Sequence, residues 1–549
     1  MAKVVTEISP RPGFFYTHKK KLLVAAAVIT LLPLLFYTVS LLRMMAATIT
    51  YPWELDQGEG HNVWSAWLLM QGRGPYLDLN HYPFFNINYP PLHFVLMIPL
   101  LWILGPGLAA GRLLADLCLW GLVAAVVAIV WRYGRNGWAA ALAGLLVLAS
   151  PYFYIFGIIA SVNVSQVMFG AWALFFLGLA LDKVEADGSV KAAEVVSYKY
   201  LMIGLILLLA ALYTKQQAID AVAAGFLFLL WRRPKIAIVG AVLFGLVGGG
   251  LFLLIDRLTS HLFYINLVKV NINDFIRRQL FEQGMAYILT HAPLLLMAAA
   301  YALLTLWSKQ RVSLWLIYLV TTGVGSFAVG KFGAAETYFY SSIAAVVIVS
   351  SLLVARLLNS LHTESSENEQ TGFKLNLARF TALPVLAIAA FGLLLIQNII
   401  FYHTPETPHP WKDLIKGHSG NYVLFGKLPD ERDRAAGQRL ADIIKANPQP
   451  VLTEEASFAM VNRYEVVTNP SNILVYNQAK LWQGQELLNM VQGRCFSVIL
   501  LHGHFLPGVV QDQIHAQYRQ QEVVKLNGGD YVVWQRLSPP DPANAACHV

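Results

Sequence analysis

Two acidic residues, Asp56 and Glu59, are the side chains of this sequence best placed to carry out chemistry. They belong to the segment Glu54-Leu55-Asp56-Gln57-Gly58-Glu59-Gly60, which follows the first long apolar run. An ionised carboxylate at the edge of a membrane can take a proton from a hydroxyl group or bind a divalent cation. The alternative is that both residues cap a following helix, with Asp56 as the N-cap and Glu59 at the third helical position.

Three basic residues could hold a phosphate group near these acids. Lys215, in the sequence Thr214-Lys215-Gln216-Gln217, lies between two short apolar runs and can bind phosphate as a point charge. Its alternative role is to extend toward lipid headgroups. Arg277 and Arg278 belong to a long loop, 256–292, whose apolar and basic residues predict an amphipathic helix on the membrane surface. They could clamp a lipid-linked phosphate or only contact anionic headgroups.

Other residues could contact a substrate. Trp53 and Tyr89 carry rings that could stack on a sugar. Lys331 and Glu336 flank Gly333-Ala334-Ala335, a segment that either lines the substrate or forms a tight connection with a solvated ion pair. The sequence does not identify which residues would bind a metal.

The composition predicts a polytopic α-helical membrane protein. The chain has 549 residues, of which 56% are hydrophobic and 13% are charged, whereas soluble domains carry about 25% charged residues. Many apolar runs approach the roughly 20 residues that cross a bilayer, and we count about eleven crossings. Membrane lipids are therefore expected partners, and nucleic acid is not.

Basic residues predict the orientation of these crossings. His18-Lys19-Lys20-Lys21 precedes the first run, which indicates a cytoplasmic N-terminus. The basic loops 132–135 and 232–235 fall on the same side. The loop 44–90 and the segments around Asn163, Lys215 and Lys331 then all face outward. Between Pro91 and Val130, Gly105-Pro106-Gly107 breaks the pattern, so residues 91–105 are expected to form a short or re-entrant helix.

The last part of the chain predicts a second domain. We expect residues 1–402 to form the transmembrane domain and residues 403–549 to form an extracytoplasmic α/β domain, because strand and helix patterns alternate there. Helices are expected near 430–446, at 477–492 and after Pro507. No phosphate-binding loop or nucleophile motif is present in this region, which favours a packing or lid role. At most one disulfide can form, between Cys495 and Cys547, and the sequence does not favour it.

The order of these features resembles the GT-C-type membrane glycosyltransferases, such as the protein mannosyltransferase-like and aminoarabinose transferase-like proteins. The resemblance covers most of the chain and is strongest at Asp56-Gln57-Gly58-Glu59-Gly60, at residues 72–76 and at Asn88-Tyr89-Pro90-Pro91-Leu92. Thr214-Lys215-Gln216 and the segment from Gly333 to Tyr338 are weaker matches. Two positions depart from the family pattern, since Asn163-Val164-Ser165 lacks the second acid and Thr337-Tyr338-Phe339 lacks an Asn-Tyr-acid pattern.

The resemblance implies transfer of a sugar from a polyprenyl-phosphate-linked donor to an unidentified acceptor, with inversion, on the outer face of a bacterial plasma membrane. Asp56 would be the base, with Glu59 as its rival, and Lys215 with Arg277 or Arg278 would bind the donor phosphate. Trp53, Tyr89, Lys331 and Tyr338 would contact the substrate. The departures leave an alternative, in which the chain is a non-catalytic relative that serves as a subunit of a membrane complex.

Overall fold

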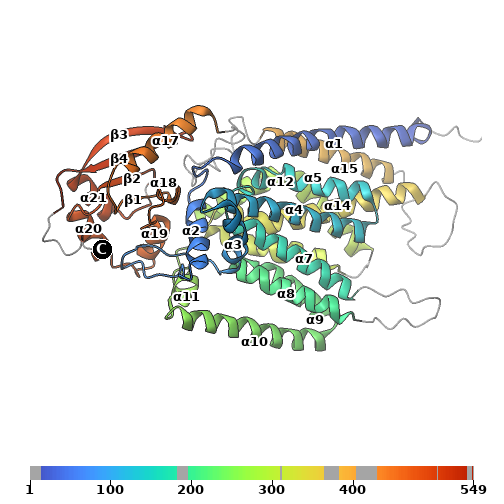
Figure 1. Cartoon of the computed structure of the whole chain (residues 1–549). Coiled ribbons are helices and arrows are strands. Elements are labelled where there is room, and N and C mark those ends of the chain that lie inside the picture. The colour runs from blue at the N-terminus through green and yellow to red at the C-terminus, as the bar shows by residue number, and fades with distance from the viewer. Residues whose placement is uncertain are drawn as a thin grey trace, which may run out of the picture.

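The computed structural model describes residues 14–181, 196–308, 312–363, 382–403, 429–503 and 505–540, together with Cys547. A bundle of long helices forms one part of the molecule, and a small sheet with its own helices covers one end of that bundle (Figure 1). Residues 404–428, which belong to the expected second domain, lie outside the described residues. The N-terminal helix α1 and the last bundle helix α15 lie side by side along the bundle.

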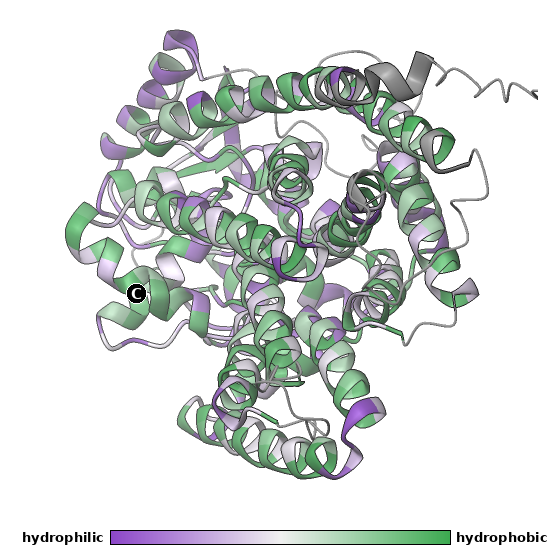
Figure 2. Cartoon of the chain, turned by 90° about the vertical axis from the view of Figure 1, so that its right-hand side faces the viewer, coloured by the Kyte–Doolittle hydropathy of each residue, from purple (hydrophilic) through white to green (hydrophobic). Residues whose placement is uncertain are grey.

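Within the described ranges, six helices are long and apolar enough to cross a membrane: Ala25–Ile49, Leu108–Gly134, Asn163–Leu181, Pro234–Leu258, Arg277–Trp307 and Glu336–Leu361. Five shorter apolar helices accompany them, and hydrophobic residues cover most of the bundle (Figure 2). The helices of this part are α1 (Phe14–Ile49), α2 (Glu59–Met70), α3 (Leu92–Leu104), α4 (Leu108–Gly134), α5 (Gly137–Ala149), α6 (Pro151–Phe156), α7 (Asn163–Leu181), α8 (Tyr198–Thr214), α9 (Ile219–Arg232), α10 (Pro234–Leu258), α12 (Arg277–Trp307), α13 (Leu314–Gly325), α14 (Tyr340–Thr363) and α15 (Ala382–His403).

Two predictions about the bundle have different outcomes. The break at residues 105–107 is confirmed, because α3 ends at Leu104 and Gly105 adopts a left-handed φ of 79° before α4 begins. The surface helix expected in the loop 256–292 is wrong. That segment contains only the short α11 (Leu262–Tyr264) and a π-helical turn, η2 (Ile265–Lys269), and Arg277 already begins α12.

The second part contains a four-stranded sheet in the order β1-β2-β4-β3. Strand β1 (Leu452–Thr453) pairs parallel with β2 (Val498–Leu501), and β4 (Gly529–Arg536) pairs antiparallel with β2 and with β3 (Tyr518–Leu526). Its helices are α17 (Glu431–Lys445), α18 (Ala456–Val461), α19 (Pro470–Gln478), α20 (Gln485–Gln492) and α21 (Gly508–Gln517). The single helix expected at 477–492 is therefore wrong, since Gly484, with φ 68°, begins a separate helix α20.

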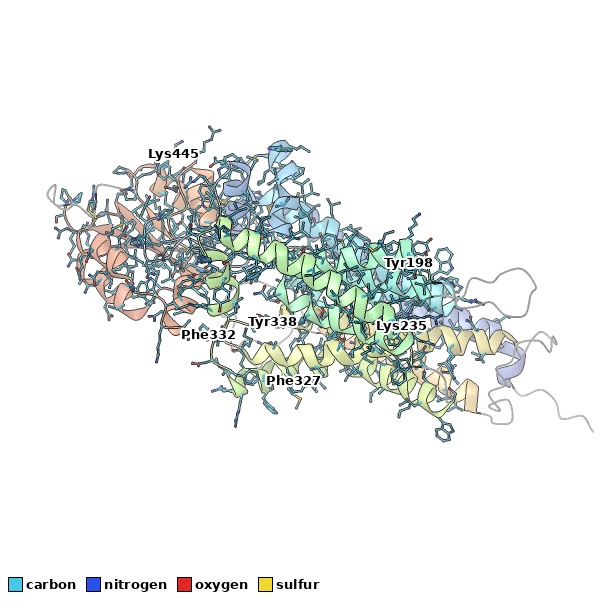
Figure 3. The ribbon with its side chains drawn as sticks, turned by 90° about the horizontal axis from the view of Figure 1, so that it is seen from below. Tyr198, Lys235, Phe327, Phe332, Tyr338 and Lys445 are labelled. Atoms are coloured by element: carbon cyan, nitrogen blue, oxygen red, sulfur yellow. A yellow bond between two sulfur atoms is a disulfide. The ribbon has the colours of Figure 1, made fainter. Side chains whose placement is uncertain are left out.

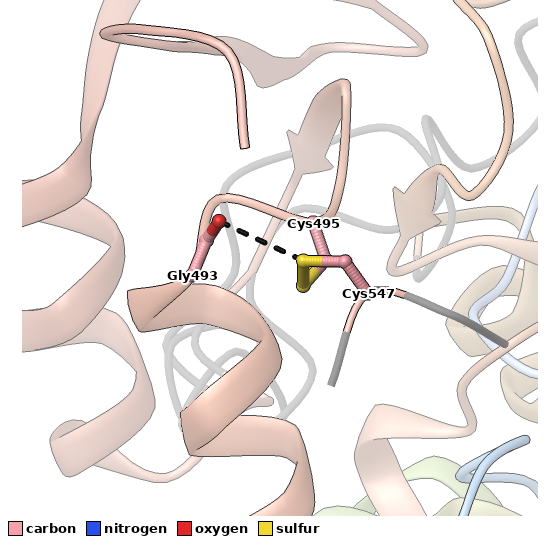
Figure 4. The surroundings of a disulfide bond; sticks show 3 residues. All are labelled: Gly493, Cys495 and Cys547. Atoms are coloured by element: carbon pink, nitrogen blue, oxygen red, sulfur yellow. Dashed lines mark hydrogen bonds between the residues drawn. A yellow bond between two sulfur atoms is a disulfide. The ribbon is translucent and has the colours of Figure 1, made fainter. Parts of the chain in front are cut away.

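The disulfide that the sequence did not favour is present. Cys495 and Cys547 are bonded across 52 residues, and the sulfur of Cys547 also contacts the carbonyl of Gly493 (Figure 4). This bond fixes Cys547, near the C-terminus, to the end of α20. Sequence could not settle the pair, because disulfide formation depends on the Cα positions of two residues that lie 52 positions apart in the chain.

Buried asparagines join the two parts of the molecule. Asn86, from the loop before α3, hydrogen-bonds to Asn266 of η2 and receives bonds from the Asn472 side chain of α19 at 2.8 and 3.0 Å. Tyr476 also donates to Asn266, and Asn469 donates to the carbonyl of Asn86 at 2.8 Å. Because buried polar groups must be paired, this network fixes the sheet-containing part on the end of the bundle.

Candidate functional site

The loop between α1 and α2, residues 50–58, carries Glu54 and Asp56, and Glu59 follows it at the start of α2. We call this segment the acidic loop, and a single arginine of α4 holds it. Arg112 is fully buried and donates to Glu59 from Nε at 2.8 Å and from Nη2 at 2.7 Å. It also donates to the carbonyls of Thr48, Tyr51 and Trp53 at 2.6 to 2.8 Å. Glu59 accepts two further bonds, from the backbone N–H groups of Leu55 and Ala160.

These bonds argue against Glu59 as a base. Burial alone would raise the pKa of its carboxyl, but the charge and hydrogen bonds of Arg112 lower the pKa overall. A carboxylate that accepts bonds from an arginine and two backbone groups has no free position for a substrate proton. The helix-capping alternative is also wrong, since Gly58, with φ 104°, is the N-cap of α2 and Asp56 precedes it.

Asp56 has a different environment from Glu59. Within the described part of the chain, no side chain hydrogen-bonds or pairs with its carboxylate, and only the backbone N–H of Gln57 is bonded to it. Burial raises its pKa well above the usual range, and the carboxylates of Glu59, Glu336 and Glu54 add to this effect. Asp56 is therefore a strong base in its ionised form, and its oxygens are available to a ligand.

Trp53 and Glu54 contact the sheet-containing part instead of facing a substrate. The ring of Trp53 is 1% exposed and stacks on Phe458 of α18 at 5.1 Å, so the predicted sugar contact is not supported. The Glu54 carboxylate accepts hydrogen bonds from the backbone N–H groups of Ser457 and Gly58 at 3.0 and 3.2 Å. Burial raises the pKa of Glu54 to about 7. Both residues therefore fix the acidic loop from the side of the second part.

Lys215 lies in a polar and aromatic cluster at the end of α8. The residue is 3% exposed, and its ammonium group donates to Asn163 Oδ1 at 2.6 Å and lies 4.5 Å and 5.7 Å from the ring centres of Tyr338 and Tyr89. This burial contradicts the interpretation that Lys215 extends to lipid headgroups. Tyr338 itself lies at the end of the bundle that the second part covers (Figure 3).

Tyr89 connects the lysine to the acid. Its ring faces Lys215, and the charge of Asp56 acts on its hydroxyl group. The Tyr76 hydroxyl donates to the carbonyl of Tyr89 at 2.8 Å, which fixes the turn before α3. The side-chain N–H groups of Gln216 and Gln217 donate to the carbonyls of Asn88 and Tyr338, at 3.3 and 2.8 Å. The amide oxygens of both glutamines have no partner among the described residues, so they can accept bonds from substrate hydroxyls.

Glu336 is a site residue whose proximity to Asp56 was not expected. It is 3% exposed, lies within electrostatic reach of Asp56, and Gln283 Nε2 is 3.5 Å from its Oε1. Gln279, one turn earlier on α12, donates to the carbonyls of Val329, Lys331 and Ala334. These glutamines bond the segment 329–336 to α12, and the charge of Glu336 in this segment acts on Asp56. The solvated Lys331–Glu336 pair is not formed, since Glu336 is buried.

The other predicted phosphate ligands lie elsewhere. Arg277 and Arg278 are exposed at the start of α12, and Arg278 pairs with Glu282 at 2.6 Å. No described contact brings either arginine to Lys215. Lys331 is half-buried, which lowers the pKa of its ammonium group, and this ammonium group has no hydrogen bond or ion pair among the described residues.

The described residues contain no group of three His, Cys, Asp or Glu side chains placed to hold a metal ion. The arrangement does place a carboxylate, two tyrosine rings, two amides and a buried ammonium group at one end of the bundle. Such a set can accept a proton at one position and stabilise negative charge at another.

Comparison with known proteins identifies the fold. No family profile and no curated protein matches this sequence. The structure of ArnT from Cupriavidus metallidurans bound to undecaprenyl phosphate is similar over 94% of this chain and 98% of that chain, with 15% identity and a TM-score of 0.53. The Archaeoglobus fulgidus oligosaccharyltransferase AglB, in complex with an inhibitory peptide and a dolichol-phosphate, covers 89% of this chain and 70% of its own, with 13% identity and a TM-score of 0.48. The chain is an integral membrane protein with the GT-C glycosyltransferase fold that the sequence predicts.

Proposed function

We propose that this protein is an inverting glycosyltransferase that uses a polyprenyl-phosphate-linked sugar. The observation that carries the proposal is that Tyr89 lies close to two groups. One is the carboxylate of Asp56, which has no side-chain partner among the described residues, and the other is the buried ammonium group of Lys215. The first group is suited to a substrate proton and the second to a phosphate. The likeness in fold to a protein that binds undecaprenyl phosphate supports a lipid-linked donor.

The reaction follows from these positions. Ionised Asp56 takes the proton of an acceptor hydroxyl group, and the hydroxyl oxygen attacks the anomeric carbon of the donor sugar. The bond from that carbon to the phosphate oxygen breaks, and polyprenyl phosphate leaves with the electron pair. Negative charge grows on the leaving phosphate, where the ammonium group of Lys215 stabilises it. Attack from the face opposite the phosphate inverts the anomeric configuration.

The substrate contacts belong to the same proposal. Tyr89 and Tyr338 lie on either side of Lys215, within reach of a sugar held at the phosphate. The amide oxygens of Gln216 and Gln217 are suited to sugar hydroxyls, which donate hydrogen bonds. Arg277, Arg278 and Lys331 would take part only as outer contacts of the lipid phosphate.

The orientation of the protein is part of the proposal as well. A cytoplasmic N-terminus places the site and the sheet-containing part on the outer face of the membrane. The Cys495–Cys547 disulfide supports this arrangement, because such bonds persist in oxidising compartments.

The test is release of undecaprenyl phosphate from a panel of undecaprenyl-phosphate hexoses and pentoses. Purified protein would be incubated with each donor and a cell-envelope fraction as acceptor, and products would be followed by mass spectrometry. We expect release from at least one donor, together with a mass increase of one sugar in the acceptor fraction. Absence of release from every donor, with stable co-purification of other membrane proteins, would favour the non-catalytic subunit.

A further inference from the structure

Arg112 uses every N–H group that an arginine side chain has. Its Nε donates to Glu59 Oε1, one Nη donates to the carbonyls of Thr48 and Tyr51, and the other donates to the carbonyl of Trp53 and to Glu59 Oε2. All five bonds are 2.6 to 2.8 Å long, and the residue is fully buried. A guanidinium group presents five donors in a fixed planar geometry, so the atoms around it are held in fixed relative positions.

These acceptors bracket the acidic loop. Thr48 belongs to the last turn of α1, Tyr51 and Trp53 follow it, and Glu59 begins α2. Asp56 therefore lies inside the nine-residue connection between α1 and α2, and residues at both ends of this connection are bonded to one side chain. The loop N–H groups of Leu55 and Gly58 are bonded in turn to the carboxylates of Glu59 and Glu54.

Arg112 belongs to α4, and the close packing of this helix against its neighbours holds the arginine in place. The neighbouring Gly111 packs so closely that a Cβ there would overlap the side chains of Ala160 and Val63. Helix α4 is therefore in direct contact with α2 and with the segment before α7. Movement of Arg112 relative to the loop would require these backbones to separate.

We propose that Arg112 is a positioning residue, which aligns Asp56 with the acceptor hydroxyl by holding both ends of the acidic loop from α4. This inference rests on the proposed function of Asp56 as the base. Displacement of a reacting group by about 1 Å can lower turnover about 100-fold. Loss of part of the clamp should therefore affect turnover more than affinity for the donor, whose phosphate we place at Lys215.

The first variant is Arg112→Lys, which keeps a positive charge beside Glu59 but provides three donors in place of five. We expect kcat to fall about 100-fold, with the Kd for undecaprenyl phosphate unchanged. Hydrogen exchange of the backbone amides in residues 48–60 should become faster. The matched control is Arg73→Lys, because the exposed Arg73–Glu465 pair at 2.8 Å also reaches from this region to the second part. Arg73→Lys should retain wild-type turnover and exchange.

The second variant is Glu59→Gln, and its readout is the pH profile. Among the described residues, the carboxylates whose charges act on Asp56 are those of Glu54, Glu59 and Glu336. The charge of Asp56 in turn acts on the hydroxyl groups of Tyr89 and Tyr340. Asp56 works in its ionised form, and the negative charge of Glu59 raises its pKa. Removal of that charge lowers the pKa, so the acidic limb of the kcat/KM profile should move to lower pH. An unmoved limb would show that Asp56 is not the group whose ionisation controls kcat/KM, and the alignment of Asp56 would then have no part in turnover.

The outcomes distinguish failure of the positioning role of Arg112, whose bonds to Thr48, Tyr51, Trp53 and Glu59 we call the clamp, from failure of the proposed function. Wild-type turnover in Arg112→Lys, or equal losses of turnover, donor affinity and folded protein, would overturn the positioning role. If the wild type transfers no sugar from any donor, the proposed function fails, and hydrogen exchange and lipid binding still decide on the clamp. Faster exchange in residues 48–60 with unchanged lipid affinity supports it, and unchanged exchange rejects it.

Discussion

The sequence leaves two roles open for Lys215, and the structure favours one of them. In the sequence it is a lysine between two short apolar runs, and such a residue can equally well reach lipid headgroups or bind a ligand. In the structure it is buried between Tyr89 and Tyr338 and bonded to Asn163. Asn163 stands where relatives of this fold were expected to carry an acid. A neutral amide there places no negative charge beside Lys215, so Asn163 does not compete with an anionic ligand, although the charge of Asp220 acts on the ammonium group.

If Lys215 binds the donor phosphate as proposed, its protonation should make donor binding depend on pH. Burial lowers its pKa to about 7, so the ammonium form that attracts phosphate predominates below pH 7 and is lost as the pH rises above it. We expect the Kd for undecaprenyl phosphate to increase steadily between pH 7 and pH 9. Lys215→Met should weaken binding about 10- to 100-fold at pH 7, as expected for loss of a charged hydrogen bond, and should remove the pH dependence.

Native mass spectrometry or a thermal-shift titration at each pH measures this Kd. Lys269→Met is the matched control, since Lys269 is an exposed lysine that also lies over a tyrosine ring, that of Tyr264 at 5.8 Å. It should bind like the wild type. Equal affinity of the wild type and Lys215→Met across this range would remove Lys215 from the donor site.

At the scale of the elements, the sequence predicts those features of a helix that depend only on its own residues, such as its length and its end. Long apolar runs produce membrane helices wherever they occur, and Gly105 ends α3 because glycine favours left-handed φ values. The loop 256–292 was predicted wrongly because some of its residues contact the rest of the protein instead of continuing a surface helix, although Ile272 and Phe275 are exposed. Phe263 is fully buried and packs against Tyr76, and Asn266 bonds to Asn86.

The candidate site was only partly predictable for the same reason. Asp56 and Lys215 stand out by type and position, whereas Glu336 and Gln279 gain a role only when α12 brings their segment to the acidic loop. Arg112 did carry a signal that we did not use. An arginine inside an apolar run costs free energy unless it is paired, and its presence there indicates a partner.

Helix α17 offers a test of how the second part supports the acidic loop. Gly437 lies against Trp53, and a Cβ at this position would overlap the indole ring. We expect Gly437→Ala to lower the free energy of unfolding by about 1 to 3 kcal/mol, because overpacking forces the ring or the helix to shift. Gly508→Ala, in α21 of the same part, is the matched control, since nothing lies within 4 Å of its Cβ.

Thermal unfolding of both variants in the same detergent measures the difference. The midpoint of Gly437→Ala should fall while that of Gly508→Ala stays at or above the wild-type value. Identical midpoints would show that α17 is not packed on Trp53, and the support of the acidic loop from the second part would have to be reconsidered.

At the scale of the whole molecule, the sheet-containing part is fixed to the bundle by contacts that bear on the site. Glu54 accepts a bond from Ser457, Trp53 stacks on Phe458, and Asn527 donates to the carbonyl of Glu54 at 2.8 Å. These contacts favour the packing role of the second part over a freely moving lid. They join residues separated by more than 400 positions in the chain, which sequence patterns cannot reveal.

The compartment of this second part can be tested with its cysteines. If it faces outward, Cys495 and Cys547 are oxidised, and a membrane-impermeant maleimide should label the partly exposed Cys547 in intact cells only after treatment with an impermeant reductant. Cys118, which is buried in α4, should stay unlabelled in the folded protein. Labelling that requires permeabilised cells would place the domain in the cytoplasm and would contradict the proposed orientation.

The most direct measurement is the turnover of Asp56→Asn in the undecaprenyl phosphate release assay. The amide keeps the size of the side chain but cannot take a proton from the acceptor, so we expect turnover to fall by at least about 100-fold while lipid binding and the thermal midpoint match the wild type. Asp78→Asn, which changes an acid of the connection between α2 and α3 that accepts hydrogen bonds from Asn80, should retain activity. Wild-type turnover in Asp56→Asn would contradict the account, because no other described carboxylate of the acidic loop is without side-chain or cross-domain bonds.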